Sequence, residues 1–225
     1  MTETIITVRG EHSAWFPAER ATAAIGVSID GADRATVFAQ ATEAAATLRE
    51  SIIARHDADK GPITWWSSDG VTVTNYRPWN QEGKQLDLVY TASIGVRAKF
   101  SDFTALEQWI DEVALLPGVG ISGIDWALTD TTRDATTVDV RQRSVGDAVS
   151  KASTFAAAIG LSTVRAIAIA DPGMLGDVSA DTGGAYEPRM MSKASMDVGS
   201  ASMGVSLKPE EIEVSSAVDV RFIAS

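Results

Sequence analysis

The chain contains no cysteine among its 225 residues and only two histidines. Without cysteine, a disulfide, a thiolate metal site and a cysteine nucleophile are all excluded. His12 and His56 lie too far apart along the chain to form the i, i+4 pair of a helical zinc site. We therefore expect no metal and no cofactor.

Positive charge is also scarce. Nineteen Lys and Arg residues stand against thirty Asp and Glu residues, which gives a formal net charge of -11. A nucleic acid or an anionic membrane would be repelled by such a chain, so we expect neither as a partner. Long apolar runs are missing too, which excludes a transmembrane helix. The first residues, Met1 to Thr4, lack the basic and apolar regions of a signal peptide, and we expect a cytoplasmic protein.

The chain also lacks recognisable catalytic motifs. Gly118 to Gly123 matches the dinucleotide pattern G-x-G-x-x-G, but it follows a predicted helix and enters a predicted strand, whereas the cofactor motif follows a strand and opens a helix. The acidic residues are scattered, and there is neither a phosphate-binding Walker loop nor a nucleophile elbow. We assign no catalytic residue and expect a protein that is not an enzyme.

Hydrophobic residues make up 45% of the chain, enough for a substantial core, and we expect a single domain over residues 1–225. Alternating apolar positions predict strands, and apolar positions three and four apart predict helices. The resulting order favours an α+β fold, with a mixed or largely antiparallel sheet and helices packed on one face. The predicted strands are 4–9, 22–29, 63–66, 71–76, 86–98, 124–128, 164–170 and 212–222, and the predicted helices follow Asp33, Ser101 and Thr131.

The helix after Thr131 is the longest predicted element. Its apolar spacing predicts a buried face formed by Val145, Ala148 or Val149, Ala152, Phe155, Ala156 and Ile159. Thr131 is placed to cap the start of this helix, and Gly160 to cap its end. Gly146 lies inside the helix, where a glycine predicts close packing or a slight irregularity. The strand that follows, Val164 to Ala170, is predicted to be buried.

The segment from Lys151-Ala152 through Phe155 to Leu161, followed by the strand Val164 to Ala170, resembles the signature helix of the SIMPL-domain family. That family includes bacterial periplasmic immunogenic proteins and a mammalian kinase-associated signalling protein. Further segments occur in the family's order, namely Ile6 to Glu11, Arg20 to Val27, Tyr90 to Val96, Ile121 to Ile124 and Glu211 to Val220. Pro17-Ala18-Glu19-Arg20 is one residue longer than the turn common in the family. The resemblance implies a self-assembling homo-oligomer without an assigned reaction and, for bacterial members, a link to oxidative stress tolerance.

Four aromatic residues are candidates for an interface or a ligand contact: Trp65, Trp66, Tyr76 and Trp79. In an extended segment Trp65 and Trp66 point to opposite faces, so one indole is expected to be exposed unless both faces are covered. Burial, an oligomer contact and ligand stacking are all compatible with these residues, since aromatic side chains are enriched at interfaces.

Residues 171–206 are rich in Gly, Ser and Met and lack a sustained period, which predicts a flexible arm or loop within the domain. Its methionines include Met190, Met191, Met196 and Met203. They could pack as an adaptable arm, bind Cu(I) or be oxidised. The leading hypothesis is a homo-oligomer that uses the aromatic residues and this arm; the alternative is a small-molecule or carbohydrate binding module that uses the four aromatic residues.

Overall fold

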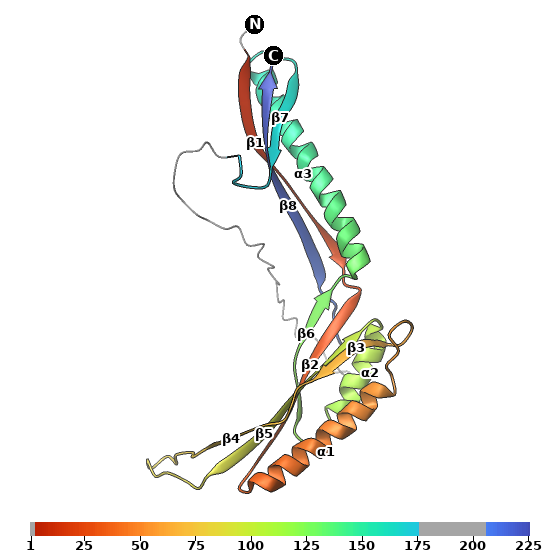
Figure 1. Cartoon of the computed structure of the whole chain (residues 1–225), viewed down its shortest axis with the longest axis vertical. Coiled ribbons are helices and arrows are strands. Elements are labelled where there is room, and N and C mark those ends of the chain that lie inside the picture. The colour runs from red at the N-terminus through yellow and green to blue at the C-terminus, as the bar shows by residue number, and fades with distance from the viewer. Residues whose placement is uncertain (1–2, 176–205) are drawn as a thin grey trace. The chain divides into compact units, whose positions relative to one another are not determined.

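The computed structural model describes residues 3–175 and 206–225. Within them, three helices and eight strands form two compact units, each with its own antiparallel sheet (Figure 1). The α+β prediction with antiparallel pairing is confirmed, although the strands divide between two sheets. We call residues 3–17, 128–175 and 211–225 the terminal unit, and residues 18–127 and 206–210 the inserted unit.

The terminal unit has a three-stranded sheet in the order β1 (Thr4–Pro17), β8 (Glu211–Ala224) and β7 (Val164–Ala170). β1 and β8 pair along their full length, whereas β7 pairs only with the last part of β8, from Asp219 to Ala224. The helix α3 (Asp130–Ala158) packs on β1 and β8. β7 has the predicted bounds, but the prediction that it is buried is wrong, because Ile167 and Ile169 are exposed.

The predicted buried face of α3 is partly wrong. The buried residues recur every fourth position and are mostly small: Val140, Ser144, Ala148, Ala152 and Ala156. A narrow sheet covers only one line along a helix, so the larger Phe155 and Ile159 lie off that line and are exposed. Small residues on the contact line let the helix backbone come close to the strands.

The ends of α3 follow capping chemistry. Thr129, rather than the predicted Thr131, caps the start, and its side chain accepts the backbone N–H of Thr132. Gly160 ends the helix with a φ of +80°, as predicted. The backbone N–H of Leu161 then donates to the carbonyl of Ala156, which is the bond expected one residue past a left-handed cap.

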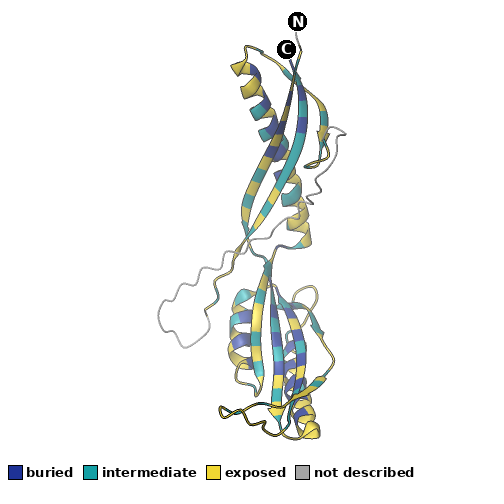
Figure 2. Cartoon of the chain, turned by 90° about the vertical axis from the view of Figure 1, so that its left-hand side faces the viewer, coloured by how far each residue is buried: buried dark blue, intermediate teal, exposed yellow. Residues whose placement is uncertain are grey.

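The inserted unit has a sheet in the order β3 (Ile63–Ser68), β5 (Val89–Phe100), β2 (Arg20–Gly31) and β6 (Val119–Ala127), and β4 (Thr72–Tyr76) also pairs with β5. The helices α1 (Arg34–Ile53) and α2 (Phe103–Val113) share one hydrophobic core with the inward face of this sheet. Buried and exposed positions alternate along these strands (Figure 2). The cap Asp33 and the stripe of α1, from Val37 to Ile52, are confirmed.

Two features of the inserted unit were not predicted. Trp109 of α2 is fully buried, and its indole N–H donates to Ser51 of α1 over 3.0 Å. The stretch Gly118 to Gly123 follows α2 and enters a strand, as predicted, but only Gly118 has a turn conformation, with a φ of +70°. β6 begins at Val119, earlier than predicted, because glycines at 120 and 123 weaken the apolar alternation of a strand that is nevertheless paired.

Candidate functional site

Trp65 and Trp66 lie side by side on β3 and point to opposite faces of the sheet, as predicted. Trp66 lies opposite Ala98 of β5 and packs against the core of the inserted unit. Trp65 lies opposite Lys99 and is 45% exposed. The ammonium of Lys99 lies 5.7 Å from the centre of the Trp65 ring, so one face of this indole already has a cationic neighbour.

Tyr76 and Trp79 belong to a different part of the same unit. Tyr76 lies opposite Val89 of β5, ten residues from Lys99, which places it about 33 Å from Trp65 along the strand. The four predicted aromatic residues therefore do not form one site. Instead, Tyr76, Trp79 and Leu86 are 52%, 67% and 43% exposed around the turn between β4 and β5. We call these three residues the hairpin tip.

The hairpin tip has an ordered backbone. Trp79 pairs with Gln85, and the backbone N–H of Leu86 donates to the carbonyl of Pro78 over 2.8 Å. Within the turn, the side chain of Asn80 accepts the backbone N–H groups of Glu82 and Lys84. These bonds order the backbone of the turn that carries the three exposed apolar side chains.

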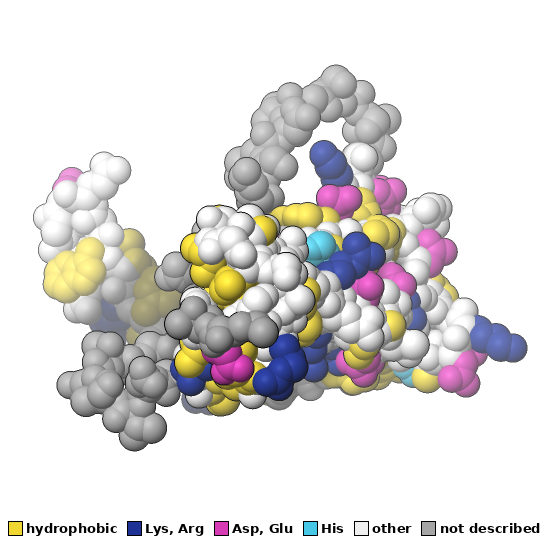
Figure 3. Space-filling view, turned by 90° about the horizontal axis from the view of Figure 1, so that it is seen from above, with side chains coloured by type: hydrophobic (Ala, Val, Ile, Leu, Met, Phe, Trp, Pro, Cys, Tyr) yellow, Lys and Arg dark blue, Asp and Glu magenta, His cyan; other side chains and the backbone are white. Residues whose placement is uncertain are grey.

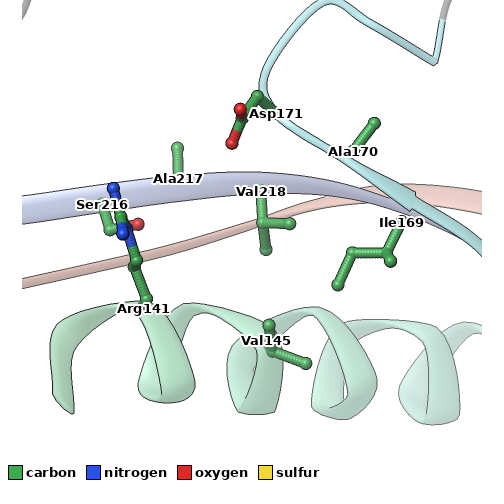
Figure 4. A pocket seen from close by; sticks show the side chains of 8 residues that line it. All are labelled: Arg141, Val145, Ile169, Ala170, Asp171, Ser216, Ala217 and Val218. Carbon is green, nitrogen blue, oxygen red and sulfur yellow. The ribbon is translucent and has the colours of Figure 1, made fainter. Parts of the chain in front are cut away.

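A shallow hollow lies in the terminal unit, where β7 ends beside α3. Its volume is about 370 Å³. Figure 4 shows Val145 of α3 and Val218 of β8 facing each other across it, with Ile169 of β7 at one side. Arg141 rises from α3 toward Ser216, whereas Asp171 lies on the other side of the strands. We call this feature the edge hollow; its lining between helix and sheet is mainly apolar.

The chain after β7 is held on the face of the sheet that lies away from α3. The carboxylate of Asp219 accepts the backbone N–H of Gly173 over 2.7 Å and two hydrogen bonds from the guanidinium of Arg9, at 2.7 and 3.1 Å. The Arg9 bonds, followed by the weaker effect of the Gly173 N–H, lower the pKa of Asp219 in spite of its partial burial. Arg221 adds a hydrogen bond to the carbonyl of Leu175. The turn thus leaves the edge of β8 instead of following it.

The other edge of this sheet is formed by β1, and side chains of α3 bond to its backbone. The backbone N–H of Glu11 on β1 donates to Asp147 over 2.8 Å, and Lys151 donates to the backbone carbonyl of Arg9 over 2.9 Å. Lys151 also forms an ion pair with Asp147, which lies one helical turn earlier, at 2.7 Å. The hydrogen bond from Lys151 and that from Glu11 lower the pKa of Asp147. The sequence shows the ion pair but not its contacts with β1.

The other candidate residues carry less structural information. Met190, Met191, Met196 and Met203 lie outside the described residues.

In residues 3–175 and 206–225, no three His, Asp or Glu side chains are grouped so that they could hold a metal ion. None of the helices in these ranges combines the length and apolarity that a membrane crossing needs. Acidic and basic side chains lie next to one another on the surface seen in Figure 3.

The fold and these surfaces define an α+β protein in two compact units with an exposed aromatic hairpin and an edge hollow. A family model named SIMPL, described as a protein of unknown function (DUF541), matches residues 6–222. The chain belongs to this family, and the match extends through both units. No curated protein matches the chain.

Proposed function

We propose that the protein is a non-enzymatic, self-assembling protein that forms a homo-oligomer. The observation that carries this proposal is the hairpin tip, where three large apolar side chains are held in water on an ordered turn. Large exposed apolar side chains on an ordered turn are typical of interaction surfaces, and aromatic residues are enriched where subunits meet. A contribution to stress tolerance, which the family resemblance implies, would be a property of the assembly.

The energetics favour a subunit contact at this tip. Complete burial of an exposed Trp79 side chain stabilises a contact by about 2 kcal/mol. Because the turn is already fixed by hydrogen bonds, little conformational freedom is lost when a neighbour covers it.

The test is the native mass of the full chain, measured by light scattering on a gel-filtration peak at two protein concentrations. We expect a discrete multiple of 23.8 kDa that is stable on dilution. A monomer at both concentrations would overturn the proposal. Trp79→Ser is expected to lower the mass or to make it concentration-dependent, whereas Leu115→Ser, which removes an isolated exposed leucine, is the matched control.

The second candidate is a binding module, and Trp65 is the residue that favours it. Its indole is partly exposed on the sheet face that α1 and α2 leave open, and only the ring face away from Lys99 is available for stacking. Fluorescence titration with a panel of sugars and metabolites tests this function. A response that Trp65→Phe abolishes would support binding, and no response across the panel would count against it.

A further inference from the structure

Among the described strands, β8, the middle strand of the terminal unit's sheet, has a partner on only one side along about half of its length. β1 pairs with all of β8, but among the described strands only β7 pairs with the other side, and its register stops at Asp219. The segment Glu211–Val218 therefore has no described strand beside it on that side. We call this segment the open edge.

The backbone groups of the open edge point toward the side that has no described strand. The N–H of Glu11 and the carbonyl of Arg9 bond to α3, so the pairs of these residues with Ala217 and Asp219 are not the hydrogen-bonded pairs of the ladder. Backbone groups of an antiparallel strand alternate in direction, and the register between β1 and β8 has no shift. Ala217, Ser215, Glu213 and Glu211 thus direct their N–H and C=O groups away from β1.

Specific contacts create this edge. β7 cannot continue alongside it, because Pro172 has no N–H to donate and Gly173 is bound to Asp219 on the other face. The far edge of the sheet, on β1, is covered by Asp147 and Lys151. One edge is thus protected against strand addition and the other is left as a template for it.

The edge hollow lies beside the open edge on the α3 side. A strand added there would place alternate side chains toward α3, next to Val145, Val218 and Ile169. An apolar side chain at such a position would fill the hollow and cover Val149, which is also exposed on this flank of α3. The occupant must therefore be an extended segment with apolar residues at every second position.

We propose that the occupant is the open edge of a second copy of this chain, paired antiparallel about a two-fold axis at Val214. The inference rests on the proposed self-assembly and adds a second contact surface, in the terminal unit, to the hairpin tip. In this register Ile212 of the second copy lies beside Ser216, at the edge hollow, and both hollows are filled at once. Symmetric pairs of this kind close on themselves.

The charges of the open edge favour this antiparallel register. Glu213 faces Ser215 of the second copy and Glu211 faces Ala217, so no two carboxylates lie directly opposite. A parallel arrangement in register would place each glutamate against its copy. A shift by two residues would place Glu211 against Asp219, where β7 already pairs.

The spacing of the helices is also consistent with the proposal. α3 packs on both β1 and β8, so the two-fold axis places the two α3 helices two strand spacings apart. With about 4.8 Å between strands, the helix axes lie about 10 Å apart. This is close to the distance of roughly 8–10 Å at which helices pack against each other.

Proline substitution tests the strand pairing. Ser215→Pro removes an N–H that points to the second copy, while the bonds of β8 to β1 stay intact. Ser13→Pro is the matched control, since Ser13 is the partner of Ser215 on β1 and its N–H points to the opposite edge. We expect Ser215→Pro to lower the native mass at least twofold and Ser13→Pro to leave it unchanged, with circular dichroism confirming that both variants are folded.

Two further variant pairs cover the case in which a proline variant does not fold. Val145→Lys, at the hollow, is expected to lower the mass, whereas Val138→Lys, elsewhere on the exposed surface of α3, is not. Val214→Cys places two thiols at the two-fold axis of a chain that has no cysteine, with Cα atoms about 4.5 Å apart, within disulfide range. Oxidised glutathione, which takes up the two electrons and two protons, should give a covalent dimer, and Ala14→Cys should not.

The outcomes separate the two proposals. A wild-type chain that is monomeric removes the proposed function and this inference with it. An oligomeric wild type whose folded Ser215→Pro and Val145→Lys variants keep the full mass, and whose Val214→Cys variant does not cross-link, overturns the open edge as the interface and leaves self-assembly standing.

Discussion

Gly10 is the residue on which the packing of the terminal unit depends most. A Cβ atom at this position would lie 2.0 Å from the backbone carbonyl oxygen of Ser144 and 2.7 Å from the Cβ of Ala148. Neither neighbour is the free end of a flexible side chain, so β1 or α3 would have to move. Only a glycine permits this approach of strand and helix.

We predict that Gly10→Ala lowers the free energy of unfolding by about 3 kcal/mol, the upper range for overpacking a core. Gly146→Ala is the matched control: nothing lies within 4 Å of its added Cβ, so the expectation of close packing there is wrong. This variant should stabilise the protein by about 1 kcal/mol, the helix preference of alanine over glycine. Urea unfolding of both variants makes the comparison, and equal effects would contradict this account of α3 docking.

Asp219 makes the free energy of unfolding of the terminal unit depend on pH, and the direction of this dependence follows from the pKa of its carboxyl. Its folded-state pKa is depressed below the unfolded value, chiefly by the hydrogen bonds from Arg9. The stability it contributes is therefore present above the unfolded pKa of about 4 and is lost as the pH falls through the folded value. Asp147 acts in the same direction.

We expect Asp219→Asn to destabilise the protein at pH 7 and to reduce the loss of unfolding free energy between about pH 5 and pH 3. Denaturant unfolding at a series of pH values measures both effects. A variant whose pH dependence matches that of the wild type would show that the Arg9–Asp219 contact does not stabilise the folded state.

Some single residues were predictable and others were not. Asp33 and Gly160 act through local chemistry, namely a carboxylate that caps a helix and a glycine that accepts a positive φ, and both predictions are confirmed. The burial of Trp109 depends on Ser51, which lies 58 residues away in the sequence. The close approach at Gly10 likewise depends on a distant segment. Local patterns cannot show such contacts.

At the scale of elements, the width of the sheet decides which side chains of α3 are buried. Phe155 matches a helical apolar pattern, yet the three-stranded sheet does not reach it and it is 54% exposed. Phe222 of β8 lies on the face toward α3 and is 1% exposed. A pattern of apolar residues shows a potential face but not whether a partner covers it.

Alanine substitutions of Phe222 and Phe155 should therefore have very different effects on the free energy of unfolding. Phe222→Ala should cost about 4 kcal/mol of unfolding free energy, because it opens a cavity in the core. Phe155→Ala should change the unfolding free energy by no more than about 0.5 kcal/mol. The comparison is best made in dilute protein, and a large effect at Phe155 in a folded monomer would contradict the exposed position.

The strands were largely predictable because alternation is a local signal. The inward positions of β5, from Tyr90 to Ala98, face the core as predicted. The division into two sheets was not predictable, since which strand pairs with which depends on contacts between distant segments. β1 pairs with β8, about 200 residues away, and neither segment shows this in its own sequence.

At the scale of the whole molecule, the described residues form two hydrophobic cores, and most of the inserted unit, residues 18–127, lies between β1 and α3 in the sequence. The sequence indicated the family, and the match over residues 6–222 confirms it. It also named the aromatic residues, but it could not show that Trp65 and Tyr76 lie far apart along β5. The edge hollow and the open edge were missed, because they result from where β7 stops.

The most direct measurement is the native mass of the wild-type chain, by light scattering at two concentrations. We predict a discrete multiple of 23.8 kDa that does not change on dilution. A mass of one chain at both concentrations would contradict self-assembly and would direct attention to Trp65 as a ligand contact.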